Sequence, residues 1–281
     1  MPLVAIIGAG DLGGALAHTL ARRERVDRLR LIDPDATVAA GVALDIQQAG
    51  PLEPFRTRLD ATADPSAALG AAVVVLARPA RATWQADDWL AWLRRTCPTD
   101  RQPLVVCAAP DHDAVIARAV HERLVPRHHI AGSAPLAYVS GLRALIGVAI
   151  DRSPADIAVS VLGRPGRWVV AWSEATVGGF PLEVVVAPPV LVGLKRRAAG
   201  LWPPQPYALA SAAARVVEAF IEGGRRDFAC FVALDGQSRG TLVTSMPVTL
   251  GPAGVSVSRV PPLSPHEQTL LDNALGEGRQ G

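Results

Sequence analysis

Residues 3–13, with the sequence Leu-Val-Ala-Ile-Ile-Gly-Ala-Gly-Asp-Leu-Gly, decide the fold of this chain. Leu3–Ile7 is a short and wholly apolar run, which is typical of a buried parallel strand. A glycine-rich segment, Gly8–Gly13, follows, and behind it apolar residues such as Leu16 and Leu20 recur at helical spacing. The stretch therefore predicts a strand, a tight glycine turn and a helix.

The glycine turn follows the Gly-x-Gly-x-x-Gly pattern, which binds dinucleotides when it lies between a strand and a helix. Gly8 permits the tight turn, Gly10 lets the backbone approach a pyrophosphate, and Gly13 lets the helix pack on the strand. Asp11 and Leu12 begin the helix, whose free N–H groups and positive dipole favour phosphates. We expect these five residues to bind the cofactor.

A second strand, Leu29–Ile32, ends at Asp33, about 20 residues beyond the glycine turn, which is the usual spacing of the ribose-binding acid. A carboxylate at this place accepts hydrogen bonds from a ribose diol and repels a 2′-phosphate. We therefore expect Asp33 to bind the cofactor and NAD to be favoured over NADP. The alternative is the same fold with no bound nucleotide.

Strand-like and helix-like segments continue to alternate up to about residue 135. The expected strands are 71–76 and 103–107, and the expected helices are 37–48, 86–95 and 111–124. This alternation predicts an α/β fold with a doubly wound parallel sheet of the Rossmann type. It gives a dinucleotide-binding domain at residues 1–135.

The pattern changes in the remaining residues, 136–281, where strand-like runs cluster between helices. The expected helices are 136–150, 207–222 and one from Ser264, and the expected strands are 156–162, 168–172, 227–233, 241–248 and 254–258. The apolar, proline-bearing segment 180–204 fits neither pattern. We predict an α+β C-terminal domain here.

Composition limits the class of protein. Hydrophobic residues make up 49% of the 281 residues and charged residues 19%, which is typical of a globular chain, and the net charge of +2 is too small to indicate nucleic acid as a partner. The cysteines, Cys97, Cys107 and Cys230, are too widely spaced for a disulfide framework or a zinc site. We expect a cytoplasmic protein with no membrane partner and no metal.

Four later motifs appear in a specific order: Ala43–Ile46, Ala175–Leu182, Met246–Gly254 and Pro262–Glu267. Together with the glycine turn and Asp33, they resemble the lactate/malate dehydrogenase family along nearly the whole chain. The resemblance implies an NAD cofactor and hydride transfer between NAD and a 2-hydroxy or 2-oxo acid. It also implies a homodimer or homotetramer in which the helix at 37–48 packs between subunits through Ala39, Ala40, Ala43 and Leu44.

The resemblance also implies a catalytic set that this chain lacks. The family uses a histidine in a Gly-x-His-Gly turn, an aspartate that orients it and an arginine that grips the substrate carboxylate. The turn Gly163–Gly166 places Pro165 at the histidine position, while Tyr138 and Gly141 stand at the aspartate and arginine positions. Ala109 replaces an asparagine that binds the substrate. We assign no catalytic residue.

The cofactor loop departs from the family as well. The family's threonine-alanine-glycine turn is Ala77-Arg78-Pro79 here, so a side chain and a proline replace small residues beside the dinucleotide. Asp11 places a carboxylate at the phosphate loop, where Coulomb repulsion disfavours it. Arg81 is the candidate for the family's mobile-loop arginine. These changes predict weak NAD binding.

Three hypotheses follow. The first is a degenerate family member that binds a dinucleotide without classical 2-hydroxy acid dehydrogenase activity. The second is an active NAD-dependent oxidoreductase on an atypical hydroxy or oxo substrate, with Tyr138 or His112 as a substitute proton donor. The third, an NAD-requiring glycosidase, is disfavoured because that chemistry needs metal ligands. We expect His112 to be partly exposed in a first helical turn, and Cys107 to be a small core residue.

Overall fold

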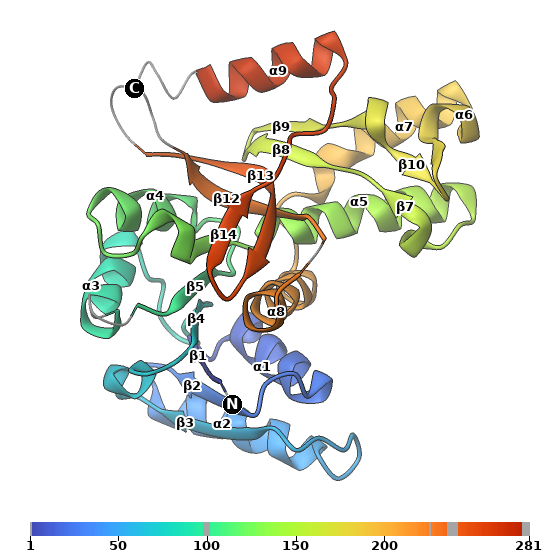
Figure 1. Ribbon diagram of the computed structural model, residues 1–281. Coiled ribbons are helices and arrows are strands. Elements are labelled where there is room, and N and C mark those ends of the chain that lie inside the picture. The colour runs from blue at the N-terminus through green and yellow to red at the C-terminus, as the bar shows by residue number, and fades with distance from the viewer. Residues whose placement is uncertain (1, 98–101, 225, 235–240, 277–281) are drawn as a thin grey trace.

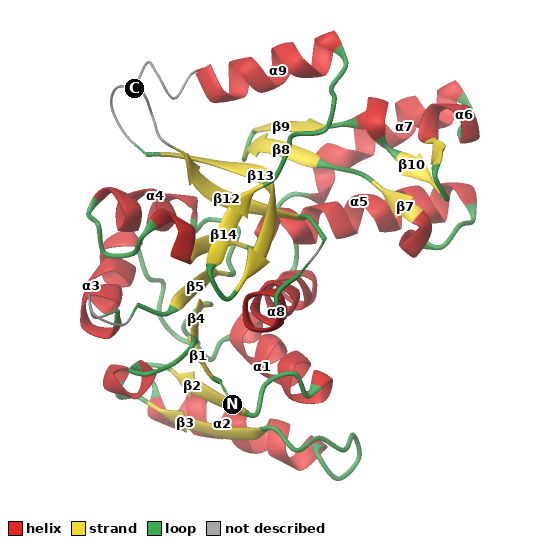
Figure 2. Cartoon of the chain, viewed as in Figure 1, coloured by secondary structure: helices red, strands yellow, loops and turns green. Residues whose placement is uncertain are grey.

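The computed structural model describes residues 2–97, 102–224, 226–234 and 241–276 (Figure 1). The N-terminal half alternates strands and helices, as the sequence predicts (Figure 2). Its elements are β1 (Leu3–Ile7), α1 (Asp11–Arg23), β2 (Arg28–Ile32), α2 (Ala36–Ala49), β3 (Arg58–Thr62), β4 (Val73–Leu76), α3 (Ala86–Thr96), β5 (Leu104–Cys107), α4 (Asp113–His121) and β6 (Ile130–Gly132).

These six strands form one parallel sheet in the order β3-β2-β1-β4-β5-β6. The order reverses between β1 and β4, which are adjacent in the sheet although β1 is followed by β2 in the chain. Leu3–Ile7 and Val73–Leu76 are almost wholly buried, as expected for central strands with helices on both faces. The doubly wound Rossmann-type sheet predicted from the sequence is confirmed.

The C-terminal half extends the same sheet with antiparallel strands. Its helices are α5 (Ala134–Ile150), α6 (Leu182–Val185), α7 (Pro188–Ala198), α8 (Pro206–Glu222) and α9 (Pro265–Gly276). Its strands are β7 (Ile157–Ala158), β8 (Val161–Arg164), β9 (Arg167–Val170), β10 (Thr176–Val177), β11 (Phe180–Pro181), β12 (Phe228–Leu234), β13 (Leu242–Gly251) and β14 (Gly254–Val257). The mixture of helices and antiparallel strands is the α+β arrangement predicted for this half.

The junction between the two halves is a pair of strands. β12 joins the parallel sheet beside β6, with Phe231 opposite Gly132, and the order continues through β13, β8 and β9. A separate three-stranded sheet holds β7, β10 and β11. Helix α8 lies beside α1 (Figure 1), and its buried face includes Ala213, Val217 and Phe220. The two halves therefore share one continuous core.

Some boundaries differ from the sequence expectations. Strand β3, Arg58–Thr62, was not predicted, because its polar residues lie at an exposed edge of the sheet. Helix α4 begins at Asp113 instead of 111, and α5 begins at Ala134 because Pro135 lies in its first turn, where proline is tolerated. The part of the chain that the structure describes contains no helix of sufficient length and apolarity to span a bilayer.

Candidate functional site

The glycine turn lies at the carboxyl end of β1, at the point where the strand order reverses. Open parallel sheets bind their ligands at such a point. Gly8 has a φ of +100°, which only glycine adopts without strain, and a Cβ on Gly13 would lie 1.8 Å from the carbonyl oxygen of Gly8. Helix α1 therefore packs closely on the turn only because residue 13 is a glycine, as the sequence predicts for Gly13.

The space in front of Gly10 is occupied by the segment that follows β4. A Cβ on Gly10 would lie 2.8 Å from the carbonyl oxygen of Arg78 and 3.2 Å from that of Pro79. The Gly10 N–H donates a hydrogen bond to the Arg78 carbonyl oxygen at 3.0 Å. Because Gly10 has no side chain, the segment after β4 can lie directly against the glycine turn.

Asp33 lies directly after β2 and is only 1% exposed. Its Oδ2 accepts hydrogen bonds from the N–H groups of Ala9 at 2.7 Å and Ala80 at 3.0 Å. Its Oδ1 accepts one from the N–H of Asp35 at 3.0 Å, and Asp35 in turn pairs with Arg81 at 3.0 Å. The carboxylate holds three loops together and is almost wholly buried, so a ribose diol can reach it only if one of these loops moves.

A pocket of about 380 Å³ opens at the N-terminus of α1. Asp11 and Leu12 line one side and the proline-rich segment 203–206 lines another. The N–H groups of the first helical turn favour an anion here, whereas the carboxylate of Asp11 opposes one. The site fits a phosphate group at α1, but Asp33 as it stands does not fit a ribose.

The turn that the sequence places at the catalytic position joins β8 to β9. Arg164 pairs with Arg167 across the hairpin, so Pro165 and Gly166 form its two-residue tip. Gly166 has a φ of +78°, and proline followed by such a glycine is typical of a type II turn. Pro165 therefore suits the backbone of the turn, and its side chain carries no proton that could be transferred to a substrate.

Tyr138 and Gly141 both lie on α5, one turn apart, and Tyr138 is almost wholly buried although it borders a pocket described below. Tyr138 is 2% exposed, its hydroxyl donates to the carbonyl oxygen of Ala198 at 3.1 Å, and burial raises the pKa of its phenol. A Cβ on Gly141 would lie 3.6 Å from Cδ1 of Leu201. The two positions are packed against α7 and the residues that follow it.

Aromatic rings fill the space between the hairpin and α5. The ring of Trp168 lies 5.3 Å from that of Tyr138, 4.7 Å from that of Trp202 and 5.8 Å from that of Phe231, measured between centroids. We call these four residues the aromatic cluster. The sequence analysis missed it, because Trp202 and Phe231 come from distant segments and no local pattern joins them.

A pocket of about 590 Å³ borders the aromatic cluster on the side of α7 and α9. Its ionisable lining residues, besides Tyr138, are Lys195, His266 and Glu267. Glu267 accepts hydrogen bonds from Ser264 within the first turn of α9, so it caps its own helix. Trp202 lines this pocket, whereas the following Pro203 lines the pocket at α1.

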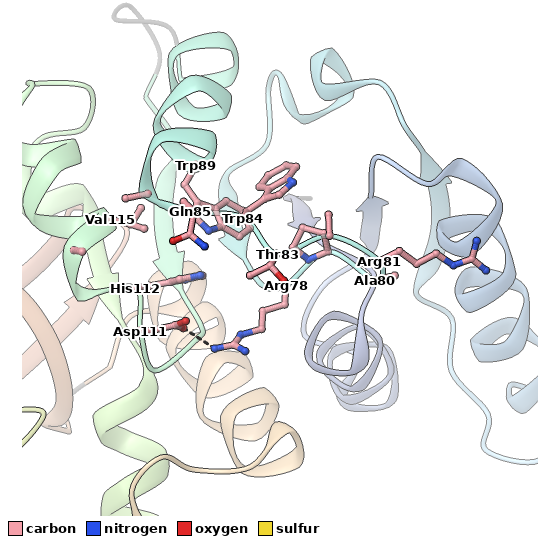
Figure 3. A pocket seen from close by; sticks show the side chains of 14 residues that line it. Arg78, Ala80, Arg81, Thr83, Trp84, Gln85, Trp89, Asp111, His112 and Val115 are labelled. Atoms are coloured by element: carbon pink, nitrogen blue, oxygen red, sulfur yellow. Dashed lines mark hydrogen bonds and ion pairs between the residues drawn. The ribbon is translucent and has the colours of Figure 1, made fainter.

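A third pocket, of about 580 Å³, lies between the segment 78–86 and the start of α4 (Figure 3). The guanidinium of Arg78 pairs with Asp111 at 2.7 Å across one side of it. The expectation that His112 is partly exposed is wrong: the ring packs edge-on against Trp89, and the residue is 4% exposed. Burial lowers the pKa of His112 to about 4, so the imidazole is neutral at neutral pH.

The cysteines are structural. Cys107 is wholly buried at the end of β5, and burial raises the pKa of its thiol, as expected of a core residue. Ala109, two residues further on, is also buried. Within the described residues, no group of three or more His, Cys, Asp and Glu side chains is placed to hold a metal ion.

Comparison with known proteins gives relatives along the whole chain. A family model described as the NAD binding domain of lactate/malate dehydrogenase matches residues 3–83. A malate dehydrogenase from Roseiflexus is 26% identical, over 96% of this chain and 94% of its own length. A protein named malate dehydrogenase 2 from Rhodopseudomonas palustris is 28% identical, over 90% of this chain and 87% of its own length.

Solved structures share the fold. Malate dehydrogenase from Salinibacter ruber superimposes with a TM-score of 0.86 at 22% identity, covering 99% of this chain and 95% of its own. Lactate dehydrogenase from Cryptosporidium parvum, in complex with lactic acid and nicotinamide adenine dinucleotide, gives a TM-score of 0.87 at 20% identity, covering 99% and 96%. The family model that matches residues 3–83 describes an NAD-binding domain, and the Cryptosporidium parvum enzyme holds NAD in its complex.

Proposed function

Because this chain belongs to the lactate/malate dehydrogenase family, we propose that it keeps the family's NAD-binding fold but has no classical 2-hydroxy acid dehydrogenase activity. The observation that carries the proposal is the aromatic cluster, which fills the space between the hairpin at Pro165 and helix α5. The positions of the implied histidine, aspartate and arginine hold Pro165, Tyr138 and Gly141. No catalytic residue is assigned.

The absence of a proton donor is the first reason to expect low dehydrogenase activity. Reduction of a 2-oxo acid leaves an alkoxide that must gain a proton as it forms. Pro165 has no proton to give, and the Tyr138 hydroxyl is already donated to Ala198. Removing a positioned acid lowers the rate by about 10²–10⁴-fold.

The absence of a cation that could bind the substrate carboxylate is the second reason to expect low activity. Gly141 faces Leu201 and carries no cation, so nothing at this position pairs with a substrate carboxylate. Positioning of a substrate in a near-attack geometry supplies several kcal/mol of the rate enhancement of an enzyme. The two losses add only in part, because such groups act as a unit. Together they leave turnover far below about 1 s⁻¹, the low end of the usual range.

We propose that NAD binds weakly. The residues that would hold it are Gly8, Gly10, Asp11, Leu12 and Gly13 at the glycine turn, and Asp33 at the ribose. When bound, NAD supplies a carbon that gives or accepts hydride. Asp33 favours NAD over NADP by its charge, but its carboxylate is buried and holds the N–H groups of Ala9 and Ala80, so a ribose contact requires one of these segments to move.

The second candidate is an active NAD-dependent oxidoreductase on an atypical hydroxy or oxo substrate, which the names of the two sequence relatives favour. It needs a substitute proton donor. Tyr138 has a raised pKa, and His112, with a pKa of about 4, is protonated in only a small fraction of molecules at neutral pH. Neither is suited to donate a proton at that pH.

Steady-state oxidation of NADH by purified protein tests the proposal, with pyruvate and oxaloacetate as separate substrates. We expect no turnover above that of a protein-free control. Turnover above about 1 s⁻¹ that disappears in Tyr138→Phe or His112→Ala refutes the proposal and identifies the replacement donor.

We further propose a cytoplasmic homodimer or homotetramer, with domains that divide near residue 135. In α2, Ala39 and Ala43 face the protein's own core, so only the outer face with Ala40 and Leu44 is available to a partner, and Leu44 is 54% exposed. Light scattering at micromolar concentration checks the assembly. A monomer contradicts it, and Leu44→Asp is expected to dissociate the oligomer.

A further inference from the structure

We infer that the pocket between the segment 78–86 and α4 binds a planar, uncharged nitrogen heterocycle that carries an amino group, the chemistry of an adenine base. We call it the loop pocket. It is lined by the loop residues Arg78 to Ala86 and by Trp89, Asp111, His112, Ala114 and Val115. The inference goes beyond the proposed function and does not depend on it.

The loop pocket is separate from the glycine turn. The pocket at α1 is lined by Gly10, Asp11 and Leu12, whereas the loop pocket is lined by the start of α3 and of α4. The backbone from Arg78 to Ala80 lines both pockets and stands between them. A ligand in the loop pocket therefore needs neither Asp33 nor the N-terminus of α1.

The size and walls of the loop pocket suit an aromatic ring. Its volume of about 580 Å³ lies within the range of small-molecule sites. The half-buried Trp84 presents indole surface on one side of the pocket, and the buried Trp89 supports it edge to face, with centroids 4.6 Å apart (Figure 3). Indole faces stack on nucleobases irrespective of sequence, because every base has a π-face.

A buried polar group points into the same space. His112 is 4% exposed, and its Nδ1 has no hydrogen-bond partner among the described residues. Figure 3 shows its ring directed into the pocket between Gln85 and Asp111. Buried polar side chains are normally satisfied by protein, water or ligand. A heterocyclic nitrogen next to this imidazole offers it a partner.

The charges favour a neutral ligand with a donor group. Arg78 and Asp111 already pair at 2.7 Å, so the pocket holds no net charge at this point for a carboxylate or phosphate to neutralise. A carboxylate accepts several hydrogen bonds at once, so Asp111 can take one from an amino group while it holds Arg78.

Calorimetric titration of the full chain with adenosine and with inosine tests the inference. Inosine replaces the amino group of adenosine by a carbonyl oxygen, which is repelled by the Asp111 carboxylate. We expect adenosine to bind at least tenfold more tightly than inosine. We expect Asp111→Asn to abolish this preference and Asp272→Asn, a matched change at an exposed residue of α9 outside the loop pocket, to leave it intact.

Substitution of the indoles provides an independent readout. Trp84→Leu is expected to weaken adenosine binding at least tenfold, whereas Trp172→Leu, a matched change outside the loop pocket, is expected to leave it unchanged. Circular dichroism of each variant confirms that it is folded. His112→Gln tests the imidazole, and we expect weaker binding there also.

Two results overturn the inference. One is that folded wild-type protein binds no adenosine up to millimolar concentration. The other is that Asp111→Asn and Trp84→Leu both leave adenosine binding unchanged, which places the nucleoside outside the loop pocket. Neither result affects the oxidation assay above, which measures chemistry on NADH, so the inference and the proposed function fail separately.

Discussion

Replacing Tyr138 by phenylalanine removes one hydroxyl from the middle of the aromatic cluster and tests whether this residue is structural or catalytic. The hydroxyl is buried with its partner, the carbonyl oxygen of Ala198, at 3.1 Å. In a structural role, its loss destabilises the fold. In a catalytic role, its loss abolishes turnover.

The magnitude follows from what the substitution leaves behind. The phenyl ring keeps its contacts with Trp168 and Trp202, so no cavity is created beyond the volume of one oxygen atom. The Ala198 carbonyl loses its donor in a buried place, which costs about 1–3 kcal/mol. Because α7 can shift slightly to expose that carbonyl to water, we expect a loss of about 1–2 kcal/mol in the free energy of unfolding.

Urea unfolding, followed by tryptophan fluorescence, measures this change. Tyr207 is the only other tyrosine in the chain and is 82% exposed, so Tyr207→Phe is the matched control. We expect the control to be within about 0.5 kcal/mol of the wild type. A shift of 1.4 kcal/mol changes the folded-to-unfolded ratio tenfold and is readily resolved.

The reasoning is refuted if Tyr138→Phe unfolds at the same urea concentration as the wild type. It is refuted more strongly if the wild type oxidises NADH with a 2-oxo acid and the variant, equally stable, does not. That outcome gives Tyr138 a chemical role, which its buried hydrogen bond to Ala198 excludes in the present account.

Gly13→Ala is expected to destabilise the fold by about 3 kcal/mol, because its Cβ overlaps the backbone of the glycine turn, whereas the neighbouring Gly14→Ala changes stability by about 1 kcal/mol or less. The pKa of His112 falls from 6.5 to about 4 on folding, so its contribution is fully present above pH 6.5 and is lost as the pH falls towards 4. Across that window the free energy of unfolding is expected to fall by about 3 kcal/mol more in the wild type than in His112→Gln, in which His129, with its own lowered pKa, still titrates. Asp33→Ala removes the acceptor of buried backbone N–H groups and is expected to lower the free energy of unfolding by about 1–3 kcal/mol, measured in urea.

The elements that the sequence predicts correctly are those set by local signals. Strand β1, the glycine turn and α1 follow from an apolar run, a glycine pattern and helical spacing within one short stretch. The tight turn at Pro165 likewise follows from neighbouring residues, since proline and glycine adopt the required backbone angles without help from the rest of the chain.

The elements that the sequence does not predict depend on contacts between distant segments. Strand β3 is recognised by its pairing with β2, because its own residues, with Arg58 and Asp60 exposed, show too little apolar character. Helix α7 begins at Pro188, and its exposed valines weaken the periodic pattern. The structure of segment 180–204 therefore depends on contacts with other parts of the chain more than on its own sequence pattern.

In the candidate site, too, local motifs predict some features and contacts between distant segments determine the others. The sequence predicts a ribose-binding role for Asp33 and the absence of a catalytic histidine at Pro165, because both predictions come from fixed motifs. It does not show that the carboxylate of Asp33 is taken by Ala80, since that depends on the path of the loop after β4. Nor does it show that Trp202 and Phe231 meet, since Trp202 lies in the segment before α8 and Phe231 in β12, which are distant in the chain.

The most direct test of the central claim is a single-turnover experiment with protein in excess over NADH. NADH is mixed with saturating oxaloacetate or pyruvate, and its absorbance is followed in a stopped-flow instrument. We expect NADH to be consumed no faster than in a protein-free control, even where fluorescence shows that NADH is bound. A burst of oxidation faster than about 1 s⁻¹, with an amplitude equal to the bound NADH, contradicts the claim that this fold has lost its chemistry.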